Sequence, residues 1–461
     1  MSRTESRTSG IMSDTVDGLS VESEVGKLEA VVVHTPGTEI ESMTPGTAKG
    51  LLYNEIVPLA AVDDEHRALK TFLSSIADVR EVTELLATAL DDDTLRHELV
   101  DRVTGSRPAN QSGPEDEPGL LARTRNRLLE CEPVDTARML VHGVPSEPTT
   151  LTGVLSGRDY DLPPLPNLYF TRDSAAVIRD ALLIGAMAFP VRTTEALIMR
   201  AAMSALVDPP NLLIDGPDLS GPVGGRASPN EPYYSGRAAG SDPLTFEGGD
   251  CLVFRRDLLV IGVSERTSPA AIDLLALRAG ERFGEPLSII AVILPKERYA
   301  IHLDMVFTFV DQATALIYEP LFVGAARLPA YRIDVAPGAA PRISREEGAL
   351  EALGRLGYPL ELIRCGGSDP VAAQREQWLS AANVFAFGPG KVIGFDCNRA
   401  TMESFQAAGY SVREISSFAE RGDSVDEYGR LFVSMPGTNL ARGGGGPRCM
   451  TMPVRRAALP A

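Results

Sequence analysis

The stretch AAVIRDALLI, residues 175–184, consists of two four-residue apolar runs on either side of Arg179-Asp180. Short apolar runs separated by polar turn residues are typical of a β-hairpin. The stretch therefore predicts strands at Ala175–Ile178 and Ala181–Ile184 that pair antiparallel. A doubly wound parallel sheet would show pure strand–helix–strand alternation, so repeated hairpins of this kind argue against it.

Similar hairpins and single helices are predicted on both sides of this stretch, which indicates a mixed α/β fold. The predicted hairpins are Leu252–Phe254 with Leu258–Val263, and Asn383–Phe387 with Val392–Phe395; the predicted helices are Val62–Ser75, Thr194–Leu206 and Pro269–Phe283; further strands are predicted at Leu28–Val33, Asn211–Ile214 and Leu287–Leu294. A Gly/Pro/Ser-rich segment at Pro217–Pro243 predicts a long loop.

Two segments differ in character from the rest. Residues 83–153 are rich in charge and contain a polar linker, Ser106–Gly119, between helical stretches at Thr94–Val103 and Leu120–Leu129. We predict a helical insertion there. Residues 1–24 are polar, lack the apolar core of a secretory signal, and are expected to form a flexible tail. Residues 25–82 and 154–461 would then form the main domain.

Composition restricts the partners of the chain. Its 461 residues carry 44 basic and 62 acidic side chains, a formal charge of −18. An acidic surface repels nucleic acid and anionic membranes, and no apolar run is long enough to span a bilayer. The five cysteines form no CxxC pair and the five histidines no HxxxH pattern, so we expect free thiols in a reducing cytoplasm and no metal site.

Four short clusters pair polar groups with glycine or apolar neighbours: PNLYFTRDS at Pro166–Ser174, FEGGDCLVF at Phe246–Phe254, HLDMVFTFVD at His302–Asp311, and ARGGGGPRCMTMP at Ala441–Pro453. Each has an ordinary explanation when taken alone. Asp173, which follows the aromatic run Leu168–Phe170 of a predicted strand, fits a capping residue, and Glu247 with Asp250 fits a turn. Cys251 fits a small core residue of a strand.

Two clusters nevertheless offer catalytic groups. If His302 and Asp304 lie on a strand, they point to the same side, and a histidine beside a carboxylate can exchange a proton near neutral pH. A surface ion pair is the alternative. Cys449 follows four glycines and Arg448, whose charge could stabilise a thiolate, so Cys449 is the strongest nucleophile candidate. A bystander thiol in a mobile tail is the alternative there.

Taken together and in order, several segments between Ser23 and Pro453 resemble the arginine deiminases, a family of guanidino-group-modifying enzymes. These segments are SEVGKLEAVVVHTPG, LLYNEI, PNLYFTRD, FEGGD, IGVSERT, HLDMVFTFVD and GGPRCMTMP. The resemblance implies a pentein-type propeller of five ββαβ units around a central site, with an inserted helical domain. It also implies hydrolysis of L-arginine to citrulline and ammonia, without cofactor or metal, by an enzyme that we expect to be a dimer or tetramer.

The resemblance also implies roles for individual residues. Cys449 matches the nucleophile, His302 the acid/base, and Asp173 and Asp304 the carboxylates that bind guanidinium. Glu247 matches the glutamate beside the histidine. The predicted substrate-binding residues are Asn167, Arg192 and Arg266, which match the groups that hold the α-carboxylate, together with Asp250 and Phe170.

The segment Ser174-Ala175-Ala176 and three single positions, Leu379, Asn439 and Gly444, depart from the family pattern, and they leave the choice of guanidino substrate open. An amidinotransferase of the same superfamily is one alternative, because it would share the cysteine and histidine but pass the amidino group to an amine. A deiminase of a related guanidino compound is another. A catalytically silent binding protein on the same scaffold is a third, which the complete set of catalytic residues disfavours.

Overall fold

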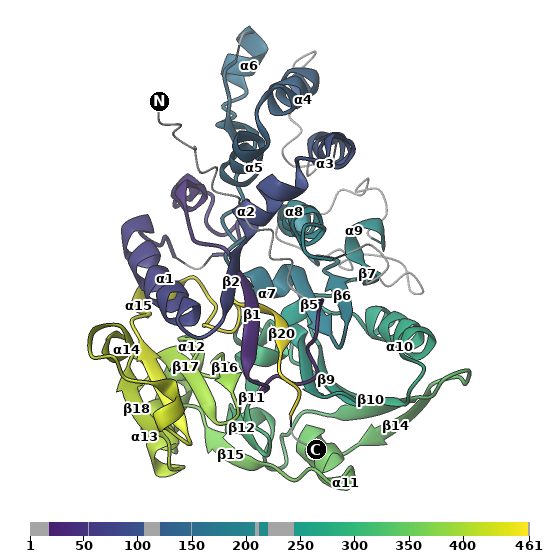
Figure 1. The fold of residues 1–461 in the computed structure, drawn as a ribbon, viewed down its shortest axis with the longest axis vertical. Coiled ribbons are helices and arrows are strands. Elements are labelled where there is room, and N and C mark those ends of the chain that lie inside the picture. Colours follow the sequence, from purple (N-terminus) through teal and green to yellow (C-terminus); the bar gives the residue numbers. More distant parts are fainter. Residues whose placement is uncertain are drawn as a thin grey trace, which may run out of the picture.

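The structure, a computed structural model, describes residues 18–53, 55–105, 120–148, 150–207, 212–219 and 244–459. These residues form an α/β fold with five larger sheets and one two-stranded sheet (Figure 1). In order along each sheet, the strands are β2 (Asp78–Glu81), β1 (Leu28–Val33), β20 (Met452–Arg456); β5 (Ala175–Ile178), β6 (Ala181–Ile184), β7 (Leu212–Asp215); β14 (Arg342–Glu346), β13 (Ala330–Val335), β10 (Leu287–Ile293), β9 (Leu258–Val263), β8 (Cys251–Arg255); β11 (Phe307–Asp311), β12 (Thr314–Ile317), β15 (Glu361–Arg364); β16 (Phe385–Gly388), β17 (Lys391–Phe395), β19 (Leu431–Met435), β18 (Ser411–Glu414); and β3 (Val144–Pro145), β4 (Tyr160–Leu162).

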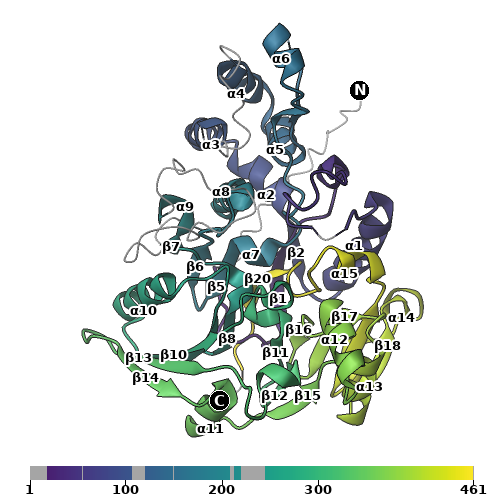
Figure 2. The same ribbon diagram turned by 180° about the vertical axis from the view of Figure 1, so that it is seen from behind.

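The five larger sheets share one pattern of pairing. In each, two strands pair antiparallel and the second of them pairs parallel with a strand that follows a helix. The helices of these crossovers are α1 (Leu59–Ser74), α8 (Thr193–Met203), α10 (Pro269–Phe283), α11 (Ala349–Arg355) and α13 (Arg399–Ala407). The first such unit joins the two ends of the chain, because β1 pairs with β20. Figures 1 and 2 show the first strands of the units toward the middle and α1, α10, α11 and α13 toward the outside.

Local sequence explains several of these elements. Helix α10 begins where Ser268 Oγ accepts a hydrogen bond from the Ala271 amide and Pro269 occupies the first turn. It ends before Gly284, whose φ of 62° is left-handed and favours glycine. Helix α1 buries Val62, Leu69, Phe72 and Leu73, which recur at helical spacing. The predicted hairpin at 175–184, the strand at 28–33 and the helix at 269–283 are confirmed.

The segment predicted as a helical insertion contains helices α2 to α6 in its described part. Their bounds are α2 (Val82–Ala89), α3 (Asp93–Gly105), α4 (Leu120–Glu130), α5 (Pro133–His142) and α6 (Leu151–Leu155). Helices α3 to α6 lie at one end of the molecule, away from the larger sheets (Figure 1). The predicted linker at 106–119 lies outside the described residues, as does most of the loop predicted at 217–243; its first three residues belong to α9 (Gly216–Leu219).

Three expectations differ from the structure. His302 and Asp304 are not on a strand, because Leu303–Met305 form a 3₁₀ turn, η6, and β11 begins at Phe307. The run at 168–170 forms turns ahead of the short helix α7 (Thr171–Ser174) instead of a strand. Residues 19–24, expected in the flexible tail, include a bridge to Arg179 and buried side chains, among them Glu24. Residues 1–17 lie outside the described part of the chain.

The remaining described helices and 3₁₀ turns are short, with the exception of α12. They are α12 (Pro370–Trp378), α14 (Ser416–Glu420), α15 (Thr438–Arg442), η1 (Thr38–Ser42), η2 (Pro190–Arg192), η4 (Gly248–Asp250), η5 (Arg298–Ala300), η7 (Glu319–Leu321) and η8 (Val425–Glu427). Within the described ranges, no helix combines the length and the apolar character needed to cross a bilayer.

Candidate active site

Seven of the ten predicted site residues line a single cavity, although they are spread over almost 300 positions of the chain. These seven are Asn167, Phe170, Asp173, Arg192, Arg266, His302 and Cys449. Glu247, Asp250 and Asp304 lie behind this lining and are fully buried. Asp173 lies on α7, which contacts η4, α8 and β5. The fold therefore brings together residues that the chain keeps apart.

Cys449 lies in the turn that follows α15, and its side chain is buried. The backbone amide of Cys449 donates to Asn383 Oδ1 at 3.0 Å, and that oxygen also accepts from the Gly446 amide at 3.1 Å. A Cβ atom on Gly445 would lie 2.4 Å from the ring of Phe170 and 3.1 Å from the Cβ of Cys449. The glycine run is thus needed for a close approach between this turn and the aromatic wall of the cavity.

The thiol of Cys449 has an acidic environment. Its sulfur lies 3.8 Å from Asp304 Oδ2. Burial, followed by the charges of Asp304 and Asp173, raises the pKa of the thiol well above its usual value, while Arg448 opposes this only weakly. In the absence of a cation in the cavity, the thiol is therefore protonated.

Arg448 favours the Cys449 thiolate, as its position suggested, but burial and the two carboxylates outweigh its effect. Its guanidinium bonds Asp304 Oδ2 at 2.6 Å and Glu24 at 3.0 Å, and it also donates to the Cys251 carbonyl. These two carboxylates neutralise its charge. Burial raises the pKa of Glu24 more than any other single influence, yet Arg448 and Arg172 together outweigh burial and bring it to about 2. The hydrogen bond from Arg448 also fixes the position of the Asp304 carboxylate.

His302 lies between two carboxylates. Its Nε2 is 2.9 Å from Glu247 Oε2, and its Nδ1 is 3.5 Å from Asp173 Oδ1. Burial lowers the pKa of His302 most strongly, but Asp173, Glu247 and Asp250 together raise it to about 9. Gly249 packs under the ring, where a Cβ atom would lie 2.6 Å from Nδ1. His302 is therefore an imidazolium at neutral pH, held in one orientation.

Two buried carboxylate oxygens near the thiol accept no hydrogen bond from any described residue. They are Oδ1 of Asp173 and Oδ1 of Asp304. A buried carboxylate oxygen without a hydrogen-bond donor is costly, so these atoms mark a place for a bound N–H donor with positive charge. A guanidinium, with its fixed fork of N–H groups, satisfies both requirements.

Arg192 and Arg266, predicted to bind a carboxylate, are themselves paired with acidic residues. Arg192 bonds Asp173 Oδ2 at 2.5 Å and Glu195 Oε2 at 2.7 Å. Arg266 lies 3.1 Å from Glu247 Oε2 and stacks on the Phe189 ring at 4.4 Å. The Nε of Arg266 is buried and has no partner, so it retains one free donor.

The other predicted binding residues have structural contacts. Asn167 Nδ2 donates to the Leu51 carbonyl at 3.0 Å, which ties the segment before α7 to the loop at 44–53. Asp250 faces away from the cavity: it accepts from Ser264 Oγ at 2.6 Å and from the Leu303 amide at 2.9 Å. Asp250 thus supports the backbone turn that carries His302 and Asp304.

Asp173, Glu247 and His302 could also hold a metal ion, since one ligand atom of each lies within 4.8 Å of the others. Arg192 and Arg266, however, already pair with the two carboxylates, so a dication there would lie beside two guanidinium groups. The absence of a metal from the working site stays a prediction.

Of the three single positions that depart from the family pattern, Gly444 lines the cavity and Asn439 is occupied elsewhere. The Gly444 φ of 95° is left-handed, and a Cβ atom there would meet no atom within 4 Å. Asn439 Nδ2 donates to Glu65 at 2.8 Å. Leu379 follows α12 and lines a neighbouring groove with Tyr299, Tyr318 and Trp378.

Sequence reasoning missed several residues of the site. Arg298, Tyr299, Gln377 and Trp378 line the same cavity, and Asn383 positions the cysteine turn. Arg298 could have been noticed from its place four residues before His302 in KERYAIHLD. The others carry no local signal.

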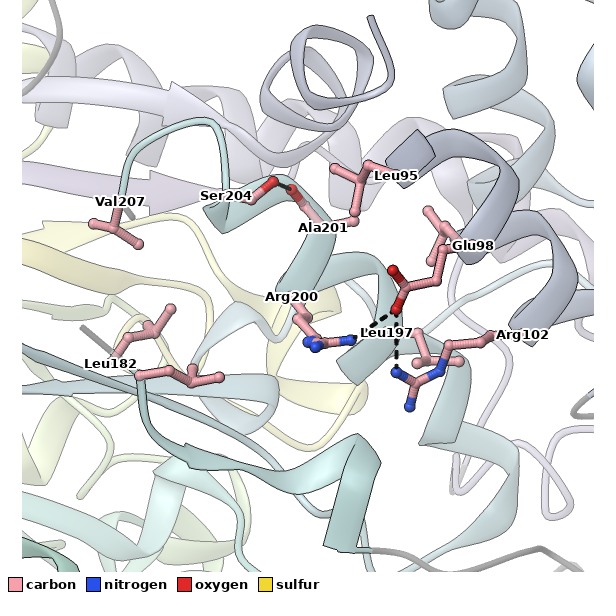
Figure 3. Close-up of a pocket in the computed structure, with 11 residues that line it drawn as sticks. Leu95, Glu98, Arg102, Leu182, Leu197, Arg200, Ala201, Ser204 and Val207 are labelled. Carbon is pink, nitrogen blue, oxygen red and sulfur yellow. Dashed lines mark hydrogen bonds and ion pairs between the residues drawn. The ribbon is translucent and has the colours of Figure 1, made fainter. Parts of the chain in front are cut away.

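A second cavity lies between α3 and α8, away from Cys449 (Figure 3). It is lined mainly by apolar side chains, with Glu98, Arg102 and Arg200 among its polar residues. Glu98 pairs with Arg200 at 3.5 Å and with Arg102 at 3.8 Å. This cavity contains none of the predicted site residues.

Comparison with known proteins gives the same family that the motifs suggested. The family model described as "Arginine deiminase" matches residues 49–208 and 227–456. The arginine deiminase of Listeria innocua serovar 6a is 31% identical over 452 residues, which cover 96% of this chain and 99% of that protein. The arginine deiminase of Bacillus cereus (strain B4264) is 31% identical over 449 residues, covering 95% and 98%.

Solved structures with detectable similarity include two guanidino-modifying enzymes. The amidinotransferase SxtG from Microseira wollei has a TM-score of 0.49 and 12% identity, with 96% of this chain and 98% of that chain covered. The N-terminal domain of the cyanobacterial arginine dihydrolase ArgZ has a TM-score of 0.47 and 12% identity, with 94% and 99% covered.

Proposed function

The chain belongs to the arginine deiminase family, and from this premise we propose that it hydrolyses the guanidinium group of free L-arginine to L-citrulline and ammonia. The observation that carries the proposal is the pair of carboxylate oxygens, Asp173 Oδ1 and Asp304 Oδ1, that accept no hydrogen bond from a described residue and lie near the Cys449 thiol. A guanidinium bound to both would present its central carbon to the sulfur.

Substrate binding would activate the nucleophile. The positive charge of the guanidinium offsets the carboxylates that raise the pKa of Cys449, so that the thiol releases its proton to solvent and the thiolate forms. The sulfur then attacks the central carbon to give a tetrahedral adduct. His302, as imidazolium, donates its proton to the departing nitrogen, so that the C–N bond breaks and ammonia leaves.

The second half of the reaction would use the same histidine in the opposite sense. The intermediate is an S-alkylthiouronium on Cys449. His302, now neutral, removes a proton from water, whose oxygen attacks the same carbon. The C–S bond breaks, the hydroxyl proton of the adduct passes to the sulfur, and citrulline leaves, which restores both the Cys449 thiol and the His302 imidazolium. Glu247 holds the ring through its 2.9 Å contact with Nε2 and supports both protonation states.

The proposal is tested by citrulline and ammonia release from L-arginine, without added metal or amine, by wild type and by Cys449→Ala. Cys131→Ala is a matched control, because Cys131 is a half-buried thiol in the helical insertion. We expect equal amounts of both products from wild type and from the control, and none from Cys449→Ala. Citrulline from Cys449→Ala would contradict the assigned nucleophile.

The main alternative, amidino transfer, is separated by the same assay. An amidinotransferase would release ornithine only when an amine acceptor is supplied, and little citrulline without it. A deiminase of a related guanidino compound would give no product from L-arginine but would act on that compound in a screen.

We also propose that the five sheet units close around the site as a five-bladed propeller, with residues 83–153 as an inserted helical domain. The shared pairing pattern and the outward position of the crossover helices support this arrangement. Five free cysteines fit a reducing cytoplasm, and light scattering would test the proposed dimer or tetramer.

A further inference from the structure

One guanidinium of the active-site cavity differs from the others in its surroundings. Arg298 lies in η5, four residues before His302, and lines the same cavity as Cys449. Arg192 and Arg266 are each neutralised by carboxylates at hydrogen-bond distance. Among the described residues, no carboxylate oxygen lies within ion-pair distance of Arg298, which instead donates a hydrogen bond to the backbone carbonyl of Leu52.

The environment of Arg298 adds to its unbalanced charge. Its side chain is half-buried. Burial lowers the pKa of Arg298 most strongly, and the nearby charge of Arg266 lowers it further. The charge of Glu265 raises the pKa, but this is the smallest of the three influences. A guanidinium stays protonated in spite of such a shift, so Arg298 presents an incompletely neutralised positive charge to the cavity.

The site therefore carries unsatisfied groups of both charges. Near Cys449, two carboxylate oxygens accept no hydrogen bond from a described residue. Arg298 has no carboxylate partner among the described residues, and the buried Nε of Arg266 has no acceptor among them. A ligand that satisfies both sets of groups carries a guanidinium and an anionic group.

We propose that Arg298 is a specificity-determining residue that binds the α-carboxylate of the substrate, together with the free Nε of Arg266. This inference rests on the proposed hydrolysis of L-arginine and deepens it. Arg298 would then select free amino acids over guanidino compounds whose carboxylate is absent or amidated, because these leave its charge unpaired.

The contact with Leu52 suggests how Arg298 is held in place. Leu52 lines the cavity and has a left-handed backbone with φ of 67°. Its carbonyl accepts from one Nη of Arg298, which leaves the remaining N–H groups of the fork for a ligand. The loop thus orients the guanidinium without neutralising it.

The test compares the binding of two ligands that differ in one charge, L-arginine and L-argininamide. Binding is measured by calorimetry in the Cys449→Ala background, where no turnover consumes the ligand. Arg298→Met keeps the apolar stem of the side chain and removes the guanidinium charge. Arg278→Met is the control, because Arg278 is exposed on α10.

We expect Arg298→Met to weaken L-arginine binding by about tenfold or more, the size of a lost hydrogen bond between charged groups. L-argininamide binding should stay within about twofold, Arg298→Lys should recover part of the loss, and Arg278→Met should bind both ligands normally. In the active enzyme, the same change should raise KM for L-arginine much more than it lowers kcat.

Two results would overturn the proposal. If Arg298→Met weakens both ligands equally, Arg298 acts on the loop through Leu52 and does not bind the carboxylate. If it weakens neither, the charge plays no part in recognition. Failure of the proposed function would give a different result. In that case neither the wild type nor any variant at position 298 would release citrulline from L-arginine.

Discussion

The sulfur of Cys449 lies 3.8 Å from Oδ2 of Asp304, so the proposed nucleophile has a carboxylate oxygen in contact with it. This arrangement keeps the thiol protonated until a cation enters the cavity. It links the reactivity of the cysteine to the charge of the substrate, and it limits reaction of the free enzyme with other electrophiles.

Asp304→Asn should lower the pKa of Cys449 in the free enzyme, because it removes the largest electrostatic contribution to the raised value. We expect faster alkylation of Cys449 by iodoacetamide at pH 7 to 8, followed by mass spectrometry of the modified peptide. Asp311→Asn, at the end of β11, is the control. An unchanged or slower rate would contradict this electrostatic account.

Glu247→Gln should shift the pH dependence of activity. The pKa of His302 is raised to about 9 with the help of Glu247, so loss of this charge lowers it and the imidazolium deprotonates at lower pH. The alkaline limb of kcat/KM should move down by about one pH unit. Glu285→Gln, which alters an exposed ion pair, should leave the profile in place.

His34 should contribute to stability in a pH-dependent way. It is buried between Glu39 and Glu81, at 3.3 and 3.2 Å, and burial, which lowers its pKa, is outweighed by these carboxylates, so the value rises to about 9. Because the folded pKa lies above the unfolded value, the contribution is complete below about pH 6.5 and is lost as pH rises through about 9.

Denaturant unfolding of wild type and His34→Asn across pH 6 to 10 measures this contribution. We expect the difference in unfolding free energy to shrink by about 3 kcal/mol over that range. A difference that is constant with pH would show that His34 stabilises the fold only by packing. His97→Asn, which alters an exposed side chain, should show no such trend.

Glu24→Gln should destabilise the fold, because it leaves Arg448 without one of its two buried carboxylates. Breaking a buried pair on one side costs about 3–5 kcal/mol. Glu22→Gln is a matched control two residues away, since Glu22 pairs with the more exposed Arg256. Chemical denaturation of both variants is the measurement. Equal midpoints would mean that Glu24 is not part of the folded unit.

Elements with strong local signals could be predicted from the sequence. The hairpin at 175–184 follows from two apolar runs across a polar turn, and α10 follows from its spacing and its caps, Ser268 and Gly284. The α/β class and the family followed in the same way, from the order of the motifs.

The turn at 302–305 could not be predicted in this way. Alternation of His302 and Asp304 suggested a strand, but the Leu303 amide donates to Asp250, fifty-three positions earlier, and Gly249 makes room for the His302 ring. These distant contacts stabilise a 3₁₀ turn. In this turn, the His302 side chain contacts Glu247, and the Asp304 side chain contacts Arg448.

The sequence by itself determined the residue types of the site, the order of its motifs and the local elements that carry them. Only the tertiary structure decided which charges neutralise one another. The sequence motif shows that Arg448 is next to Cys449 along the chain. In the structure, however, Arg448 pairs with Glu24, 424 positions away, whereas Arg298 has no carboxylate partner among the described residues. The physical reason is that ion pairing depends on distance and burial in space, and neither is encoded by proximity along the chain.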